Sequence, residues 1–288
     1  MFRAELFRKV TIIGVGLIGG SLGMAIKKNN LAREVVGVSQ RNTSLVYALK
    51  NKTIDRGFED VTQAVNNADL VVLATPVNTI VHFLSTIGPH LKRNCIVTDV
   101  GSTKCSIVEA AQKFLPNPSF FVGSHPLAGS DKAGAAYANP QLFENSLCIM
   151  TPTDQTNRLA RDKVKQFWTQ VGAKVKMLSA EEHDQILAFI SHLPHLAVYT
   201  LMETIPDEFL QYAAQGLKDT TRIAASSPKM WSDISLANSK HIVKALDALV
   251  KNASSLRKAI LSRNEKEIID QFQKAKDKRD NLSKDQHE

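Results

Sequence analysis

The chain has 288 residues, of which 43% are hydrophobic and 22% charged, an ordinary globular balance that excludes a disordered or fibrous protein. Its net charge of +8 comes from basic residues interleaved with 28 acidic ones, without an aromatic-basic motif, so we expect an anionic small molecule rather than nucleic acid as partner. The charged N-terminus resembles no signal peptide, and no run reaches the ~20 apolar residues of a membrane span. The three cysteines form no CxxC pair. We therefore expect a cytoplasmic protein with reduced thiols and no membrane partner.

Short β-rich runs alternate with helical patterns through the first half of the chain. The runs are apolar on both faces, which is typical of parallel strands covered by helices on both sides. This alternation predicts right-handed crossovers and a doubly wound Rossmann domain. The predicted strands cover residues 10–13, 34–38, 70–74, 94–98, 120–122 and 147–150, and a helix over 158–171 and a last strand over 174–178 follow.

A glycine-rich segment directly follows the first strand and precedes a helical pattern, as a dinucleotide-binding turn does. Gly14 permits the tight turn, Gly16 lets a pyrophosphate approach the backbone, and Gly19 lets the helix pack closely on the sheet. The first helical residues, Leu17 and Ile18, offer free N–H groups to the phosphates.

The end of the second strand indicates which dinucleotide binds. An NAD enzyme usually carries an acidic residue here, against the ribose 2′-hydroxyl. This chain has Ser39, Gln40 and Arg41 instead, and a serine and an arginine can bind a 2′-phosphate. The sequence therefore predicts NADP as the cofactor, with NAD less favoured.

Three further strands end in turn-forming or polar residues. They end in Thr75-Pro76, in the Asp99 to Lys104 turn with Gly101 and Ser102, and in the segment that carries His125. Ligands of open α/β sheets bind outside the carboxyl ends of the strands. We therefore expect these segments beside the nicotinamide and the substrate, with Thr75, Pro76 and Gly101 in the cofactor site.

From Ser179 onward the pattern is helical. Residues 179–182 form a capping-box sequence, and Pro194 is predicted to kink the helix that follows. Further helices are predicted over 219–226, 239–261 and 265–280. We predict two domains, an α/β domain over 1–178 and an all-helical domain over 179–288.

Taken together, the motifs resemble the prephenate/arogenate dehydrogenases of tyrosine biosynthesis. The similarity runs from about Val10 to Trp231 and rests on residues 14–22, 99–104, 125–129, 191–195 and 221–224. It implies a Rossmann domain followed by a helical domain that pairs two subunits into a homodimer. It also implies oxidative decarboxylation of a cyclohexadienol, and no residue indicates whether that substrate is prephenate or arogenate.

The resemblance also implies a role for each matched residue. His125 is the catalytic histidine at the ring 4-hydroxyl, Ser102 lies beside it, and Arg222 binds a substrate carboxylate. A neutral imidazole is suited to accept the hydroxyl proton near neutral pH. The other implied substrate residues are His195 and Ser130, which orient the substrate, Asp131 and Asp184 near the pocket entrance, and His192 and Trp231 within the pocket.

The same residues allow other interpretations. His192 and His195 are spaced for one helix face, but nothing supplies the rest of a metal shell, so we predict no metal. A β-hydroxyacid dehydrogenase or pyrroline-carboxylate reductase, which also join a Rossmann to a helical domain, is an alternative that CO2 release would exclude. A non-enzymatic NADP-sensing regulator is a second, and it would oxidise no cyclohexadienol.

Overall fold

The computed structural model describes residues 5–129 and 134–284. Within these residues the strands form an eight-stranded sheet of order β3-β2-β1-β4-β5-β6-β7-β8. The first six strands are parallel, β7 runs antiparallel to β6, and β8 is parallel to β7. The strand order reverses beside β1, which creates the switch point where α/β sheets bind ligands. The strands are β1 (Phe7–Ile13), β2 (Ala32–Val38), β3 (Arg56–Phe58), β4 (Leu70–Leu73), β5 (Ile96–Asp99), β6 (Phe121–Pro126), β7 (Leu147–Thr151) and β8 (Lys174–Met177).

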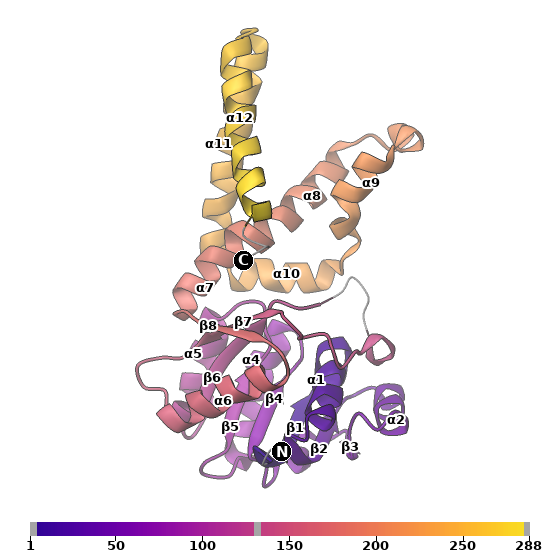
Figure 1. Cartoon of the computed structure of the whole chain (residues 1–288), viewed down its shortest axis with the longest axis vertical. Coiled ribbons are helices and arrows are strands. Elements are labelled where there is room, and N and C mark those ends of the chain that lie inside the picture. Colours follow the sequence, from indigo (N-terminus) through magenta and orange to yellow (C-terminus); the bar gives the residue numbers. More distant parts are fainter. Residues whose placement is uncertain (1–4, 130–133, 285–288) are drawn as a thin grey trace. The chain divides into compact units, whose positions relative to one another are not determined.

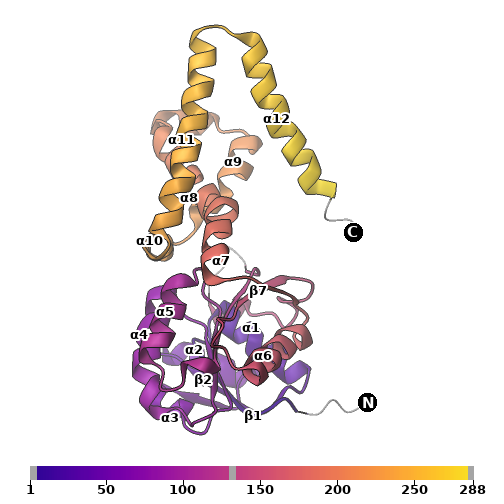
Figure 2. The ribbon, with the colours of Figure 1, turned by 90° about the vertical axis from the view of Figure 1, so that its left-hand side faces the viewer.

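Helices cover both faces of this sheet (Figures 1 and 2). One apolar core includes Leu22 of α1, Leu45 of α2 and Trp168 of α6, and the other includes Ile80 of α4 and Ile107 of α5. The predicted doubly wound Rossmann domain is therefore confirmed. The helices are α1 (Leu17–Lys28), α2 (Asn42–Lys50), α3 (Val61–Val65), α4 (Val77–Ile87), α5 (Cys105–Phe114) and α6 (Arg158–Gln170).

The elements after β8 are helical in the described part of the chain. The predicted capping box is present at the start of α7, where the Glu182 N–H donates to Ser179 Oγ and the Ser179 N–H donates to the Glu182 carboxylate. The second half is therefore all-helical, as predicted. Its longer helices are α7 (Ala180–Leu187), α8 (Leu193–Thr204), α9 (Gln215–Thr221), α10 (Pro228–Ala237), α11 (Ser239–Leu261) and α12 (Glu265–Lys284).

The predicted kink at Pro194 takes the form of a π-helical turn, Ala188–His192, directly before α8. A proline has no N–H and cannot donate to the carbonyl four residues earlier, so the regular ladder is interrupted here. The carbonyl that Pro194 leaves without this donor is that of Ile190, and the next carbonyl, of Ser191, accepts a hydrogen bond from Nδ1 of His195 at 3.0 Å. Wide turns of this kind are frequent at functional sites.

Packing divides the chain into two compact units, residues 1–239 and 240–288. The first holds the sheet, its helices and α7 to α10. The second holds most of α11 together with α12, and Gln271 of α12 donates to Ser255 of α11 at 3.2 Å. The boundary predicted near residue 178 marks the change from strands to helices, and as a domain boundary it stays a prediction.

Candidate active site

The glycine segment forms a backbone cradle between β1 and α1. Gly14 has a φ of +102°, which side chains rarely adopt, and its N–H donates to the Val38 carbonyl at 2.9 Å. A Cβ added at Gly14 would lie 2.5 Å from the Ala74 carbonyl oxygen, and one added at Gly19 would lie 1.9 Å from that of Gly14. The turn therefore brings β1, β4 and α1 closer together than a side chain at Gly14 or Gly19 would allow.

Open space lies in front of this cradle. A Cβ added at Gly16 would meet no atom within 4 Å, and no side chain caps the start of α1 at Leu17 and Ile18. The first turn of α1 carries no acidic residue. Free backbone N–H groups and the positive end of the helix dipole thus face a space that suits an anion. These features fit the phosphates of a dinucleotide.

The predicted 2′-phosphate residues follow β2. Ser39 is half-buried, and its Oγ accepts the N–H of Arg41 at 3.1 Å. Gln40 and Arg41 are exposed, and the first turn of α2, which follows, carries no acidic residue. Among the described residues no carboxylate pairs with Arg41 in an ion pair. The segment thus presents a hydroxyl and a cation without a neutralising partner.

The other predicted cofactor residues stand at the same edge of the sheet, after β4 and β5. Oγ1 of Thr75 is buried with no hydrogen-bond partner among the described residues, and Pro76 is exposed where α4 begins. Gly101 is buried, and its N–H donates to Asp99 at 2.8 Å. The unpartnered Thr75 hydroxyl is a polar atom that a bound ligand can satisfy.

A buried ion pair lies beneath the ends of β5 and β6. Lys104 and Asp99 are both fully buried, and Nζ of Lys104 donates to Asp99 and to the Ser124 carbonyl. Asp99 also accepts the N–H groups of Gly101 and Ser124. Every charge in this cluster has partners, as buried charges require.

His125, at the end of β6, begins a chain of three polar side chains. Its Nδ1 lies 2.8 Å from Nε2 of His183, and Nδ1 of His183 lies 2.8 Å from the Asp184 carboxylate. Asp184 further accepts the N–H groups of Lys104 at 2.7 Å and Cys105 at 2.9 Å. His125 is partly exposed, whereas His183 and Asp184 are buried at 0% and 1% exposure. Asp184, expected near the pocket entrance, is instead an internal support of His183 and of the start of α5.

Burial sets the charge of these groups. It lowers the pKa of His125 well below the usual 6.5, helped by His183 and Lys104. It also lowers the pKa of His183, although Asp184 opposes this change. Burial raises the pKa of Asp184, but the hydrogen bond from His183 and the backbone N–H donors outweigh that effect and leave the pKa below its usual value. Near neutral pH these three side chains are therefore two neutral imidazoles and one carboxylate.

A second cluster comes from the π-turn, α8 and α10. The ring of His195 stacks on Trp231 at 3.8 Å between centroids, and the buried His192 ring meets Trp231 edge-on at 6.1 Å. Nδ1 of His192 lies 3.2 Å from Nδ2 of Asn238, and the same Asn238 amide donates to the Asp184 carbonyl. Asn238 thus links the two clusters.

Arg222 lies at the start of a 3-10 turn, Arg222–Ala225, and is exposed. Burial lowers the pKa of His195, and the charge of Arg222 adds to this effect, so Arg222 lies near the His195 ring. Ser102 is partly exposed in the turn between β5 and α5. Ser130 and Asp131 lie outside the described residues, so their predicted roles stay predictions.

Three members of the site were not predicted from the sequence. Lys104 and Asp99 were seen only as parts of a turn, and His183 was not assigned a role although it adjoins Asp184. Adjacency to Asp184 was the only signal in the sequence for His183. Its contact with His125 joins residues 58 positions apart, and no local pattern reports such a contact.

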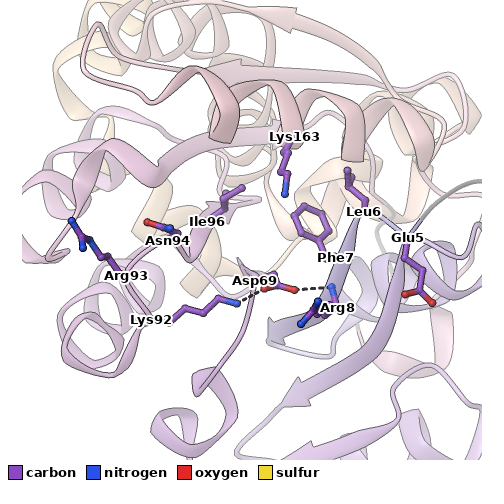
Figure 3. A pocket seen from close by; sticks show the side chains of 10 residues that line it. All are labelled: Glu5, Leu6, Phe7, Arg8, Asp69, Lys92, Arg93, Asn94, Ile96 and Lys163. Carbon is purple, nitrogen blue, oxygen red and sulfur yellow. Dashed lines mark hydrogen bonds and ion pairs between the residues drawn. The ribbon is translucent and has the colours of Figure 1, made fainter.

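The opposite end of the sheet holds a cavity of about 750 Å³ (Figure 3). Its residues precede β1, β4 and β5 or lie at the starts of these strands, except for one on α6: Glu5, Leu6, Phe7, Arg8, Asp69, Lys92, Arg93, Asn94, Ile96 and Lys163. Because parallel sheets bind ligands at their carboxyl ends, we assign the candidate active site to the His125 end.

Comparison with known proteins gives one consistent result. Residues 22–177 match the family described as "Prephenate dehydrogenase, nucleotide-binding domain", and residues 179–274 match "Prephenate dehydrogenase, dimerization domain". The chain is 37% identical to prephenate dehydrogenase of Bacillus subtilis over 95% of its own length and 76% of the relative's. The crystal structure of A. aeolicus prephenate dehydrogenase in complex with hydroxyphenyl propionate and NAD+ superposes with a TM-score of 0.91, at 31% identity over 97% of this chain and 100% of the other. Synechocystis arogenate dehydrogenase superposes with a TM-score of 0.81, at 27% identity over 95% and 99% of the two chains.

Proposed function

Because this chain belongs to the prephenate dehydrogenase family, we propose that it oxidatively decarboxylates prephenate to 4-hydroxyphenylpyruvate. The observation that carries the proposal is the neutral, partly exposed His125 at the carboxyl end of β6. The glycine cradle follows β1 at the same edge of the sheet, since β1, β4, β5 and β6 are parallel. One sheet edge thus holds a base and a dinucleotide cradle.

His125 acts as the base in this reaction. The 4-hydroxyl proton moves to Nε2 of His125, which has no hydrogen-bond partner among the described residues. The hydride on C4 leaves, the bond to the ring carboxylate breaks, and its electron pair completes the aromatic ring as CO2 departs. A bound nicotinamide dinucleotide supplies the acceptor for that hydride. His125 then returns its proton to the phenolic oxygen.

Arg222, His195 and Trp231 hold the substrate. Prephenate carries two carboxylates, and an exposed guanidinium can bind one of them with two parallel hydrogen bonds. The stack of His195 on Trp231 and the bond from its Nδ1 fix the imidazole, and in the part of the chain that the structure describes its Nε2 has no hydrogen-bond partner. Ser102, in the turn after β5, is the proposed neighbour of the 4-hydroxyl.

Arogenate is the second candidate substrate, supported by the similarity to an arogenate dehydrogenase. The two substrates differ only in a keto or amino group on the side chain. Initial rates of nicotinamide reduction with each substrate decide between them. A higher kcat/KM with prephenate is expected, whereas turnover of neither substrate would refute the proposed function.

For the cofactor we propose a preference for NADP over NAD. The A. aeolicus structure contains NAD+, and here Ser39 and Arg41 stand where an acidic ribose clamp is usual. The Ser39→Asp variant should reverse the preference, because a carboxylate repels a 2′-phosphate. Ser39→Ala is the matched control, which removes the hydroxyl without adding charge. Equal or better kcat/KM of the wild type with NAD would contradict the proposal.

We also propose that the protein is a homodimer formed through its helical half. Several large apolar side chains there are exposed, among them Ile190 at 63%, Val250 at 62% and Leu261 at 67%. Among the described residues, the helical stretch 180–204 is long and apolar enough to span a membrane, and most of its apolar part is not buried. The pairing of two helical surfaces would cover such faces, and obligate dimers have apolar interfaces of this kind. Light scattering at micromolar concentration should give twice the chain mass, and a monomer would contradict the proposal.

A further inference from the structure

Asp184, His183 and His125 form a connected series of three polar side chains. A single catalytic base would not need the other two. One contact of 2.8 Å, between His125 and His183, joins the end of β6 to α7, and a second contact of 2.8 Å joins His183 to Asp184 within α7. Two backbone N–H groups at the start of α5 hold the carboxylate in place. The middle ring is fully buried and cannot itself reach a substrate.

The donors and acceptors in this series can be ordered from its buried end. An ionised carboxylate only accepts hydrogen bonds, so Nδ1 of His183 must carry the proton that Asp184 receives. A neutral His183 then has an unprotonated Nε2, which can only accept. The contact with His125 therefore requires a proton on Nδ1 of His125. Its Nε2 is left with a lone pair.

The alternative order needs a doubly protonated His183. That cation would be fully buried, and Lys104, whose charge helps lower the pKa of His183, lies close by. Burial lowers the pKa of His183 in spite of Asp184, so the neutral ring is favoured near neutral pH.

We infer that His183, oriented by Asp184, is a positioning residue that directs the proton of His125 to Nδ1 and keeps Nε2 free to act as the base. The inference rests on the proposed function for its chemical meaning. A His125 with the proton on Nε2 could not accept the 4-hydroxyl proton at that atom. The buried pair thus selects the reactive tautomer before substrate binds.

The tautomer itself can be measured without substrate. Nitrogen NMR of uniformly ¹⁵N-labelled full-length protein distinguishes protonated from unprotonated ring nitrogens, and loss of signals in His125→Asn assigns those of His125. We expect a protonated Nδ1 and an unprotonated Nε2 in the wild type. A proton on Nε2 would overturn the inference.

Two variants test the effect on the reaction. His183→Leu removes the acceptor for His125 and should lower kcat by about ten- to a hundredfold, the range seen when groups that orient reacting residues are lost, with little change in KM. His183→Gln restores an amide oxygen as acceptor and should recover most of that loss. A folded His183→Leu with wild-type kcat would overturn the inference. If His183→Leu does not fold, the nitrogen NMR spectrum of the wild type still shows which nitrogen of His125 carries the proton.

The two proposals can fail separately. A wild type that turns over prephenate but carries the His125 proton on Nε2 refutes the inference alone. A wild type with the expected tautomer that turns over neither prephenate nor arogenate refutes the proposed function alone.

Discussion

The two ends of the sheet repeat one motif in different surroundings. At the amino end, Asp69 pairs with Lys92 and accepts the N–H groups of Arg8 and Lys9. At the carboxyl end, Asp99 pairs with Lys104 and likewise accepts two backbone N–H groups. The side chains of Lys92 and Asp69 are 37% and 25% exposed, whereas those of Lys104 and Asp99 are fully buried.

The difference in burial decides what each end can do. Water partly screens the pair at the amino end, so its charges act less strongly on their neighbours than buried charges do. At the carboxyl end the desolvated cation helps to keep His125 and His183 neutral. The same motif therefore serves as a surface ion pair at one end, and at the other it adds to the effect of burial in keeping two imidazoles neutral.

The largest expected effect is on catalysis at the carboxyl end. The His125→Asn variant should lower kcat by about 10²–10⁴-fold, the usual contribution of a positioned base, with a much smaller change in KM. Steady-state kinetics with saturating cofactor measure both constants. As a control at the amino end, Lys92→Met should keep wild-type kcat. A near-normal kcat in His125→Asn would remove His125 from the chemistry.

Breaking each of the two ion pairs should lower the free energy of unfolding by a different amount. Lys104→Met leaves the Asp99 carboxylate buried without its cation and should lower the free energy of unfolding by about 3–5 kcal/mol. Lys92→Met breaks a solvent-screened pair and should cost less than about 1 kcal/mol. Denaturant unfolding of both variants measures the difference. Equal losses would mean that burial does not distinguish the two ends.

Acid should destabilise the carboxyl end first. Burial lowers the pKa of His192 from 6.5 to about 4, so between these values the unfolded chain binds a proton that the folded protein does not. Stability therefore falls as the pH drops from 6.5 to 4, by about 3 kcal/mol from this residue. At the amino end the pKa of Asp69 is lowered from 3.8, because its hydrogen bonds to Lys92 and the backbone outweigh burial, so its contribution is lost only below that pH.

Denaturant midpoints measured across this pH range test the prediction. The His192→Gln variant should show a flatter fall in stability, since glutamine takes up no proton. An unchanged slope in that variant would assign the acid sensitivity to other groups.

The smallest effect concerns substrate binding. Arg222→Gln removes a charge-assisted contact to a carboxylate and should raise KM by about ten- to a hundredfold. A further loss of kcat is expected if Arg222 holds the ring carboxylate that leaves as CO2. Arg93, which lines the cavity at the amino end, offers the matched control, and Arg93→Gln should leave KM unchanged. Equal KM values in the two variants would exclude Arg222 from the substrate site.

Features that depend on a few neighbouring residues could be predicted from the sequence. The Gly14 turn and the Ser179 capping box follow from short patterns, and both are present. The predicted strand over 120–122 was too short, because β6 continues to Pro126. The strand β3 was missed because its three residues, with a central glycine, are too short to show a pattern. The π-turn before Pro194 appeared only as a kink, since a proline predicts interruption but not its form.

The support of the site could not be predicted in the same way. The contact of His125 with His183 and the burial of Lys104 depend on how β6, α5 and α7 pack. Asp184 was placed at a pocket entrance by family resemblance, but tertiary packing puts it inside. The residues proposed to contact ligands thus belong to motifs in the sequence, whereas for His183 adjacency to Asp184 was the only signal.

The most direct test of the account follows both products of one turnover. Wild-type protein is supplied with prephenate labelled in the ring carboxylate and with NADP+, and CO2 release and NADPH formation are measured together at neutral pH. The account predicts one CO2 for each NADPH, with 4-hydroxyphenylpyruvate as the product. Formation of NADPH without CO2 would contradict it and would indicate a plain alcohol dehydrogenase on the same fold.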